Sequence, residues 1–290
     1  MRRTRRPPSL LDALNDSSLF APLFLSPDWD AWRTFCRALT GAPMSAADLD
    51  LYRTRTGRQH APMGPASEAW VVAGRRSGKS RIASAVATYL AALAPTDTLA
   101  AGEWGTVLVC AVDKQQARVV FDYIRALFDV PALRPLVSGE TTEAIELRHR
   151  VRLEVRASNF RAVRDVTLLA AVLDEVAFLR EEGSALPDVE LYRALKPALA
   201  TTGGLILGIS SPWAQRGLLW QKYRRHFGQD GDVLVWQADS RTRYPPRQRR
   251  SGLGPFARAA EQLRRHMRRR GLDAGGTGST DFHCLPTSPQ

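Results

Sequence analysis

Two hydrophobic spacings alternate along the chain from residue 68 to about residue 240. Short apolar runs predict strands at residues 69–73, 106–112, 168–173, 204–209 and 233–236. Apolar residues three and four positions apart predict helices at residues 79–93, 114–128, 188–200 and 216–227. Residues 144–147 and 151–155 predict a hairpin that turns at His149 and Arg150. Strands that alternate with helices predict an α/β sandwich with a mainly parallel central sheet.

The first 66 residues lack this alternation and predict a short helical preamble. Residues 28–39 carry apolar side chains at helical spacing, and Ser45 is a suitable N-cap for a second helix. After about residue 240 the alternation stops, and no strand is predicted that would extend the sheet. We therefore expect an N-terminal helical segment (1–66), an α/β domain (67–240) and a C-terminal tail (241–290).

The formal net charge of +12 is unevenly distributed. Residues 241–290 contain eleven Arg and three acidic residues, which leaves 30 basic and 26 acidic residues in the first 240. A polyanionic partner is therefore indicated mainly by the tail. Arg outnumbers Lys 37 to 4, a bias that a GC-rich coding sequence also produces.

Several classes of protein are not indicated. No apolar run approaches the roughly 18 residues that a membrane-spanning helix needs. The basic N-terminus is not followed by the apolar segment of a secretory signal, so we expect a cytoplasmic protein without a membrane partner. Cys36, Cys110 and Cys284 have neither paired spacing nor a nearby His, which argues against a disulfide framework and a zinc site.

A phosphate-binding loop is indicated where the strand at 69–73 passes into the helix at 79–93. The loop pattern fits, with Ala73 instead of Gly at its first position. Gly78 leaves room for backbone N–H groups to face phosphate, Lys79 reaches the β- and γ-phosphates, and Ser80 offers a hydroxyl to Mg²⁺. The predicted ligands are ATP and Mg²⁺, and the predicted nucleotide-binding residues are Gly74, Arg76, Ser77, Gly78, Lys79, Ser80 and Arg81.

A second catalytic element follows the apolar strand at 168–173. This strand brings Asp174 to its carboxyl end, where the carboxylate is expected to hold Mg²⁺ together with Ser80. Glu175 is predicted to orient and deprotonate the attacking water. With Lys79 far upstream and strands and helices between, the combination predicts a P-loop NTPase of the additional-catalytic-glutamate, RecA-like type. Such a protein is a three-layer α/β sandwich.

A third element is the strand at 204–209, which ends in Ser210, Ser211 and Pro212. In motor ATPases, a strand end of this kind senses the γ-phosphate and relays its loss. A strand that ends in an ordinary Ser-Pro turn would have the same sequence, so this element is interpreted only together with the other two.

The order of these motifs resembles the large terminase subunits of tailed phages and prophages. The matching segments are 56–58 (TGR), 74–80 (GRRSGKS), 173–178 (LDEVAF), 209–212 (ISSP) and 216–220 (RGLLW). The resemblance implies that Arg75, with Arg76 as its neighbour and rival, is an arginine finger from the same chain. It also implies that Ser210 and Ser211 couple hydrolysis to DNA movement, and that residues 56–59 contribute to the adenine pocket.

The partners that the resemblance implies are double-stranded DNA, a portal protein, a small terminase subunit and further copies of this chain in a ring. Arg161 and Arg164 are candidates for contact with DNA or a neighbouring subunit, although solvent-facing loop charges explain both better. Two other interpretations are kept: a helicase-like P-loop ATPase that acts on nucleic acid, and a prophage remnant that binds nucleotide without packaging DNA.

The resemblance extends over roughly residues 50–240 and then fails. A complete large terminase carries an RNase H-like nuclease domain with clustered carboxylates, whereas Glu261, Asp273 and Asp281 are widely spaced. Nuclease activity is therefore not expected from this chain. The Arg-rich tail has the character of sequence read in a wrong frame or of a degraded prophage gene, and a basic DNA-binding arm is the alternative.

Overall fold

The structure, a computed structural model, describes residues 7–24, 26–157, 166–179 and 187–238. The helices are α1 (Leu10–Asn15), α2 (Ala21–Phe24), α3 (Asp30–Thr40), α4 (Ala46–Thr56), α5 (Lys79–Ala92), α6 (Lys114–Phe128), α7 (Pro187–Ala200) and α8 (Gly217–His226). The strands are β1 (Glu68–Ala73), β2 (Gly105–Ala111), β3 (Val137–Glu140), β4 (Ala144–Leu147), β5 (Val151–Ala157), β6 (Thr167–Asp174), β7 (Leu205–Ser210) and β8 (Val233–Ala238). Short 3-10 helices are η1 (Pro27–Trp29), η2 (Arg134–Leu136) and η4 (Val176–Phe178).

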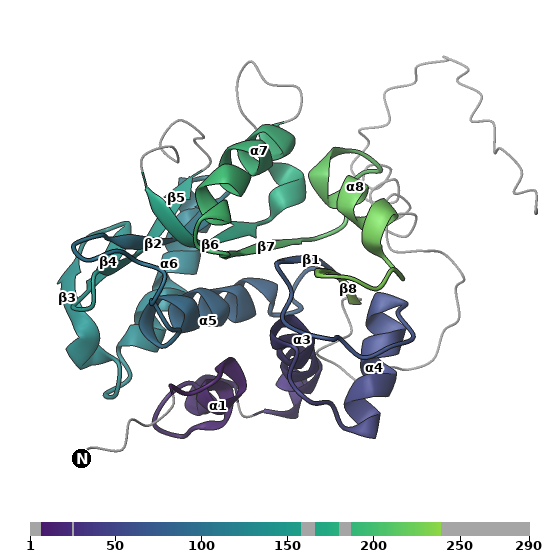
Figure 1. Cartoon of the computed structure of the whole chain (residues 1–290), viewed down its shortest axis with the longest axis horizontal. Helices are drawn as coiled ribbons and strands as arrows, with labels where there is room; N and C mark the ends of the chain where they lie inside the picture. Colours follow the sequence, from purple (N-terminus) through teal and green to yellow (C-terminus); the bar gives the residue numbers. More distant parts are fainter. Residues whose placement is uncertain (1–6, 25, 158–165, 180–186, 239–290) are drawn as a thin grey trace, which may run out of the picture.

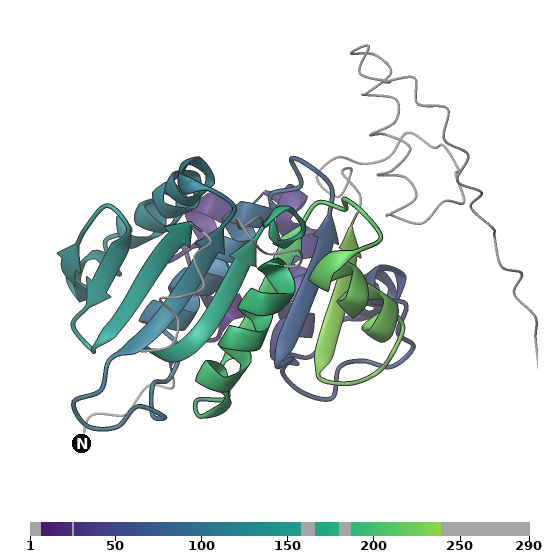
Figure 2. The ribbon, with the colours of Figure 1, turned by 90° about the horizontal axis from the view of Figure 1, so that it is seen from above.

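All eight strands form one sheet in the order β3-β4-β5-β2-β6-β7-β1-β8. The six strands from β5 to β8 in this order are parallel to their neighbours, and β3 and β4 add an antiparallel edge. The strands lie side by side in Figure 2, with the usual twist between them. The prediction of a mainly parallel sheet is therefore confirmed.

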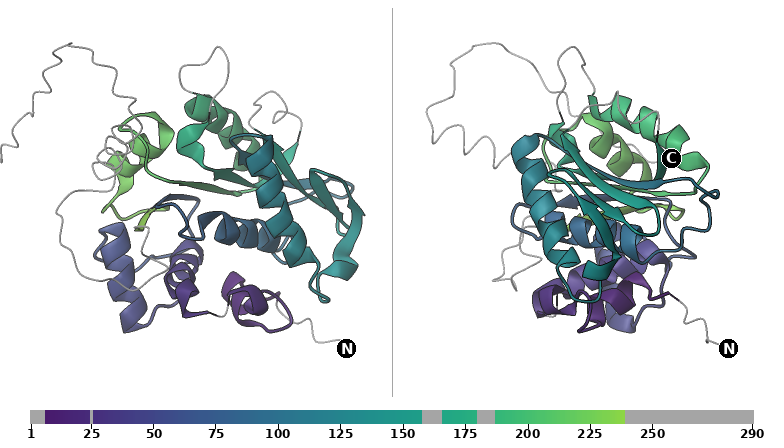
Figure 3. Two further views of the ribbon diagram at one scale, coloured as in Figure 1. Left: turned by 180° about the vertical axis from the view of Figure 1, so that it is seen from behind. Right: turned by 90° about the vertical axis from the view of Figure 1, so that its left-hand side faces the viewer.

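The sheet lies between two layers of helices. Helices α7 and α8 cover one face, and α5, α6 and the N-terminal helices lie on the other (Figures 1 and 3). Successive side chains of β1 pack alternately against the two helix layers, because neighbouring residues of a strand point to opposite faces. Trp70 and Val72 belong to the core under α7 and α8, whereas Val71 belongs to the core under α5. The predicted three-layer α/β sandwich is confirmed.

Most elements lie where the hydrophobic spacing predicts them, and the differences are short elements. The helix at 114–128 has the predicted bounds, and the hairpin is formed by β4 and β5. The hydrophobic spacing does not predict α1, α2 and β3, which have six, four and four residues. Elements this short contain too few apolar positions to show a period. Residues 28–39, predicted as one helix, divide between η1 and α3.

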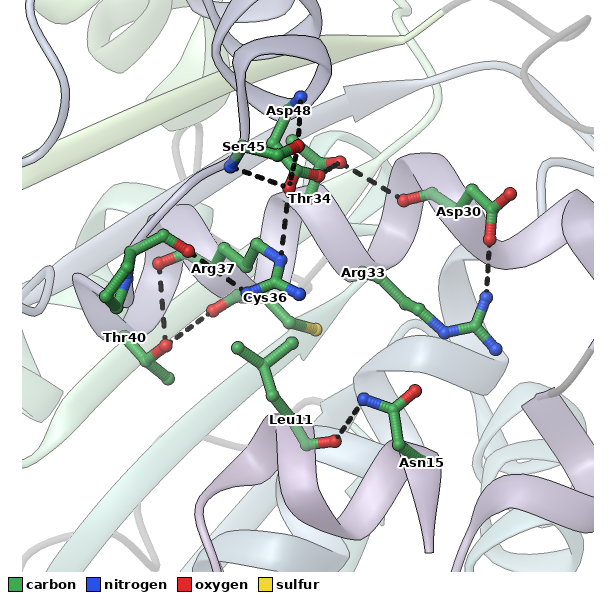
Figure 4. A network of polar contacts seen from close by, with 11 residues as sticks. Leu11, Asn15, Asp30, Arg33, Thr34, Cys36, Arg37, Thr40, Ser45 and Asp48 are labelled. Atoms are coloured by element: carbon green, nitrogen blue, oxygen red, sulfur yellow. Dashed lines mark hydrogen bonds and ion pairs between the residues drawn. The ribbon is translucent and has the colours of Figure 1, made fainter.

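The N-terminal helices are tied to one another by polar contacts (Figure 4). Ser45 caps α4, as predicted, in a reciprocal capping box with Asp48. Asp48 also joins α4 to α3, since its Oδ1 accepts a 2.6 Å hydrogen bond from Thr34 and its Oδ2 lies 3.3 Å from Arg37 Nε. These helices contact the rest of the molecule as well: α1 touches α5, and both α3 and α4 touch β8.

Some of the predicted features lie outside the described residues. These are Arg161, Arg164 and the tail at 241–290. Across the described ranges, no helix combines the length and the hydropathy needed to cross a membrane.

Candidate nucleotide-binding site

Three strand ends meet at the carboxyl edge of the sheet. Strand β7 lies between β1 and β6, so the segment after β1, the end of β6 and the end of β7 are neighbours. In open α/β sheets this edge is where ligands bind. The order explains how residues from three distant parts of the sequence form one site.

The loop between β1 and α5 has the backbone of an anion-binding concavity. Arg76 and Gly78 both adopt left-handed conformations, with φ of +62° and +85°. Gly78 is the N-cap of α5, so the first N–H groups of this helix, including those of Lys79 and Ser80, face out of its amino end. Left-handed turns that expose successive N–H groups, followed by a helix N-terminus, bind phosphate oxygens.

Ser80 and Asp174 form the oxygen-rich part of the site. The Ser80 hydroxyl lies 3.1 Å from each Asp174 carboxylate oxygen, and Gln116 Nε2 donates a 2.7 Å hydrogen bond to Asp174 Oδ2. Asp174 is fully buried, and this burial raises its pKa above the ordinary 3.8, with the charge of Glu175 adding to the shift. The hydrogen bonds from Gln116 and Ser80 and the charge of Lys79 act in the opposite direction. A hydroxyl beside a carboxylate is the donor set that Mg²⁺ prefers.

Glu175 is held by both of its carboxylate oxygens. Its Oε1 lies 2.8 Å from Lys79 Nζ, and its Oε2 accepts hydrogen bonds from the Ser210 hydroxyl at 3.1 Å and the Ser211 N–H at 3.0 Å. The Glu175 backbone is left-handed, with φ of +53°. A non-glycine residue in this region is strained and is kept there by surrounding contacts. The carboxylate therefore spans the gap between the phosphate loop and the end of β7.

The predicted arginines occupy different surroundings. Arg75 and Arg76 have exposed side chains at the tip of the loop. Arg81 instead points to the N-terminal helices: its Nη2 donates to the Leu23 carbonyl at 3.1 Å, and its guanidinium carbon lies 5.0 Å from the Trp29 ring centroid. Because these contacts hold its guanidinium, the predicted role of Arg81 in nucleotide binding falls to its backbone N–H and stays a prediction.

Ser77, which is also predicted to bind nucleotide, has a buried side chain. Only 1% of Ser77 is exposed, and its hydroxyl is buried without a hydrogen-bond partner among the described residues. Its carbonyl accepts a 2.8 Å hydrogen bond from Trp32 Nε1. The buried hydroxyl argues that Ser77 acts through its backbone.

Arg58, in the segment predicted to contribute to the adenine pocket, lies at the amino ends of β1 and β8. Arg58 is buried and donates from Nη2 to the Val233 carbonyl, which pairs with Glu68 at the start of β1. The phosphate loop begins beyond Ala73, five strand residues or about 17 Å away along β1. Arg58 therefore connects the segment after α4 to β8, and the contribution of residues 56–59 to an adenine pocket stays a prediction.

Two residues that touch the site, Gln116 and Trp32, were not predicted from the sequence. Gln116 occurs in the first turn of α6, immediately after β2, and a polar residue at the carboxyl end of a buried strand is a signal that was available. Trp32 gave no such signal, because an apolar residue on an amphipathic helix predicts only a place in the core.

No protein-family model matches this sequence, and no curated protein matches it either. Among solved structures, the chain is similar to the large terminase ATPase domain of Thermus phage P74-26 and to a point variant of that domain. Both matches have a TM-score of 0.48 and 16% sequence identity, and they cover 83% of this chain and 93% of the other. The HK97 bacteriophage large terminase matches with a TM-score of 0.44 and 17% identity, over 72% of this chain and 44% of that one. The P-loop ATPase fold of this chain follows independently from its strand order and its phosphate-loop geometry.

Proposed function

We propose that this chain binds ATP with Mg²⁺ at the carboxyl edge of its sheet and hydrolyses it. We further propose that it does so as the motor domain of a phage large terminase, which drives double-stranded DNA into a procapsid. The observation that carries the proposal is the position of Glu175, joined to Lys79 of the phosphate loop on one side and to the end of β7 on the other.

The roles of the residues follow from this arrangement. Backbone N–H groups of the loop and the Lys79 ammonium would bind the phosphates, and an exposed arginine, Arg75 or its neighbour Arg76, would neutralise charge that develops on the γ-phosphate. Glu175 would accept a proton from the attacking water, which leaves ADP and inorganic phosphate as the products. Mg²⁺ would be held by Ser80 and Asp174, where it neutralises phosphate charge.

The coupling of hydrolysis to movement is assigned to Ser210 and Ser211. Both contact the Glu175 carboxylate, one through its hydroxyl and one through its backbone N–H. A change in what Glu175 binds therefore alters the hydrogen bonding at the end of β7, directly before the segment that leads to α8. This path supports a motor, because the products of hydrolysis would be sensed away from the phosphate loop. The portal protein, the small terminase subunit and a ring of copies belong to the same proposal.

The test is ATP hydrolysis by the purified chain, with and without double-stranded DNA. Wild type is compared with Lys79→Ala and Glu175→Gln, and Glu190→Gln serves as a matched control because Glu190 is exposed on α7. Turnover by wild type and the control, lost in both site variants and stimulated by DNA, is the expected result. Turnover that survives in Lys79→Ala or Glu175→Gln would overturn the site, and binding of ATP without turnover at any DNA concentration would overturn the motor function.

A further inference from the structure

Two tryptophans from the N-terminal part of the chain lie directly against the phosphate loop. Trp32, on α3, donates its indole N–H to the Ser77 carbonyl at 2.8 Å, and only 1% of each residue is exposed. Trp29, at the end of η1, stands beside Gly78, where an added Cβ would lie 2.8 Å from the indole ring. The middle of the loop is therefore in contact with indole rings on its buried side.

The same N-terminal segment also holds the start of α5. Arg81 donates to the Leu23 carbonyl, and its guanidinium carbon lies 5.0 Å from the Trp29 ring and 5.6 Å from the Phe24 ring. Phe24 and Trp29 pack edge to face, with ring centroids 4.7 Å apart. The loop and the first turn of its helix are thus fixed from one side by one aromatic cluster.

Helix α3, which carries Trp32, is held in place by contacts with β8 and α4. Trp32 packs edge to face on Phe35 at 5.7 Å, and Phe35 packs in the same manner on Trp236 of β8 at 5.6 Å. Asp48 ties α3 to α4 through Thr34 (Figure 4). A row of packed rings therefore connects the phosphate loop to the sheet without passing through β1.

The bond from Trp32 sets the orientation of one peptide group. A trans peptide is planar, with its C=O and N–H pointing in opposite directions. Because the Ser77 carbonyl points to Trp32, the N–H of Gly78 points to the opposite side of the loop. If the peptide rotated, a carbonyl oxygen would replace this N–H and would repel a phosphate. Such a rotation changes ψ of Ser77 and φ of Gly78, and Gly78, with φ of +85°, has no Cβ that would oppose it.

We propose that Trp32 is a positioning residue of the nucleotide site. It holds the Ser77–Gly78 peptide so that the Gly78 N–H faces the phosphates of a bound nucleoside triphosphate. The N-terminal helices are then part of the nucleotide site and not an independent preamble. This inference rests on the proposed function, namely that a triphosphate binds at the loop.

The experiment replaces Trp32 by Phe, which keeps a ring and removes the N–H donor. Trp236→Phe is the matched control, because it replaces another fully buried tryptophan of the same aromatic row, keeps a ring that can pack on Phe35, and removes no hydrogen-bond donor to the loop. For Trp32→Phe we expect the Kd and KM for ATP to rise about tenfold, the worth of one hydrogen bond, while kcat stays within about twofold. Amide hydrogen exchange of the peptide that covers residues 74–80 should also accelerate, and neither change should occur in Trp236→Phe.

Three results would overturn the inference. Equal losses of ATP affinity in Trp32→Phe and Trp236→Phe would mean that both rings serve only the stability of the fold. A fall in kcat with an unchanged KM would also contradict a role in positioning for binding. If wild type binds ATP through Lys79 and Trp32→Phe binds ATP with the same Kd, the inference fails and the proposed function stands. If wild type shows no ATP binding that depends on Lys79, the inference and the proposed function fail together.

A measurement on the unsubstituted ring covers the case in which Trp32→Phe does not fold. In Glu175→Gln labelled with ¹⁵N at tryptophan, the Trp32 indole N–H should shift on addition of ATP and Mg²⁺ and gain protection from exchange. The Trp236 indole N–H should do neither. A Trp32 indole signal that stays unchanged at saturating ATP would refute a link between this ring and the phosphate.

Discussion

Lys79 Nζ and Glu175 Oε1 lie 2.8 Å apart, so the ammonium that is predicted to bind phosphate is paired with the carboxylate that is predicted to act as the base. The two side chains are 8% and 21% exposed, so the Lys79 end of this ion pair is buried and the Glu175 end is partly exposed. A phosphate that binds Lys79 must either share the ammonium with the Glu175 carboxylate or replace that carboxylate as its partner. Binding and catalysis are therefore linked through one pair of atoms.

This link predicts that Glu175→Gln separates binding from hydrolysis. The amide cannot accept the proton of water, so the rate should fall by about 100- to 10,000-fold. Lys79 loses its charged competitor, and a partly exposed ion pair is worth on the order of 1 kcal/mol, so the Kd for ATP should fall by about fivefold. Calorimetric titration with ATP measures the affinity, and weaker binding by Glu175→Gln than by wild type would contradict the competition.

Ser210 and Ser211 allow a matched comparison of two alanine variants, because they donate to the same Glu175 oxygen through different groups. Ser210 uses its hydroxyl, whereas Ser211 uses its backbone N–H and has a buried hydroxyl without a partner in the described structure. We expect Ser210→Ala to lower kcat about 10- to 100-fold, since a hydrogen bond to a charged group is worth about 1.5–3 kcal/mol. Ser211→Ala should change kcat by less than about twofold. Steady-state kinetics of the two variants test this order, which equal effects would refute.

The carboxyl edge of the sheet was predictable because its parts carry signals in sequence. Asp174, Glu175 and Ser210 each end an apolar run, and parallel strands deliver their ends to one edge. The contact between Glu175 and Ser210 was not predictable, since it depends on β7 lying beside β6, and strand order is decided by packing over the whole sheet. The position of Arg58 was not predictable either: proximity to β1 in sequence did not reveal to which end of the strand it folds.

Gln116 is predicted to keep Asp174 ionised for metal binding. Its amide donates to Asp174 Oδ2 at 2.7 Å and lowers a pKa that burial raises. Gln116→Leu removes this donor, so Mg²⁺ should have to compete with a proton up to a higher pH. The Mg²⁺ concentration for half-maximal hydrolysis should increase about tenfold or more, and increasingly as the pH is lowered. Gln115→Leu, on the exposed neighbour, is the control, and a Mg²⁺ requirement that does not change with pH in Gln116→Leu would contradict this role.

A buried carboxylate at the other edge of the sheet is predicted to govern stability in acid. Glu68 accepts hydrogen bonds from Trp70 at 3.0 Å, Tyr192 at 2.8 Å and Lys222 at 2.6 Å, and lies 2.7 Å from Lys196 Nζ. Burial alone would raise the pKa of Glu68, but these four partners outweigh it and lower the pKa from 4.5 to about 2. The carboxylate therefore stabilises the fold fully above about pH 4.5, and this stabilisation is lost as the pH falls toward 2.

Glu68→Gln should lower the free energy of unfolding by about 3 kcal/mol at neutral pH, because two lysines lose their buried counter-charge. The difference from wild type should shrink as the pH falls from 4.5 toward 2. Urea unfolding followed by circular dichroism at several pH values measures it, with Glu143→Gln on the surface as the control. A difference that does not vary with pH would show that the charge of Glu68 is not what stabilises this cluster.

Alanine substitutions at Gly78 and Gly203 distinguish the cost of backbone strain from the cost of a side-chain clash at the phosphate loop. Gly78 and Gly203 have φ of +85° and +65°, so alanine is strained at both, by about 1–2 kcal/mol. An added methyl group at Gly203 meets nothing within 4 Å, whereas at Gly78 it would lie 2.8 Å from the Trp29 ring. Since Trp29 is only 3% exposed, its ring has no room to retreat. We expect Gly203→Ala to cost only the backbone strain, and Gly78→Ala to cost about 1–3 kcal/mol more from overpacking.

Urea unfolding of the two alanine variants measures this difference without any ligand. The double variant Gly78→Ala with Trp29→Leu is its internal control, because a smaller side chain removes the clash. In this background the additional cost of Gly78→Ala should disappear, since coupled neighbours are not additive. If Gly78→Ala and Gly203→Ala cost the same in both backgrounds, Trp29 does not press on the loop, and the contact that joins the N-terminal segment to the phosphate site is absent in solution.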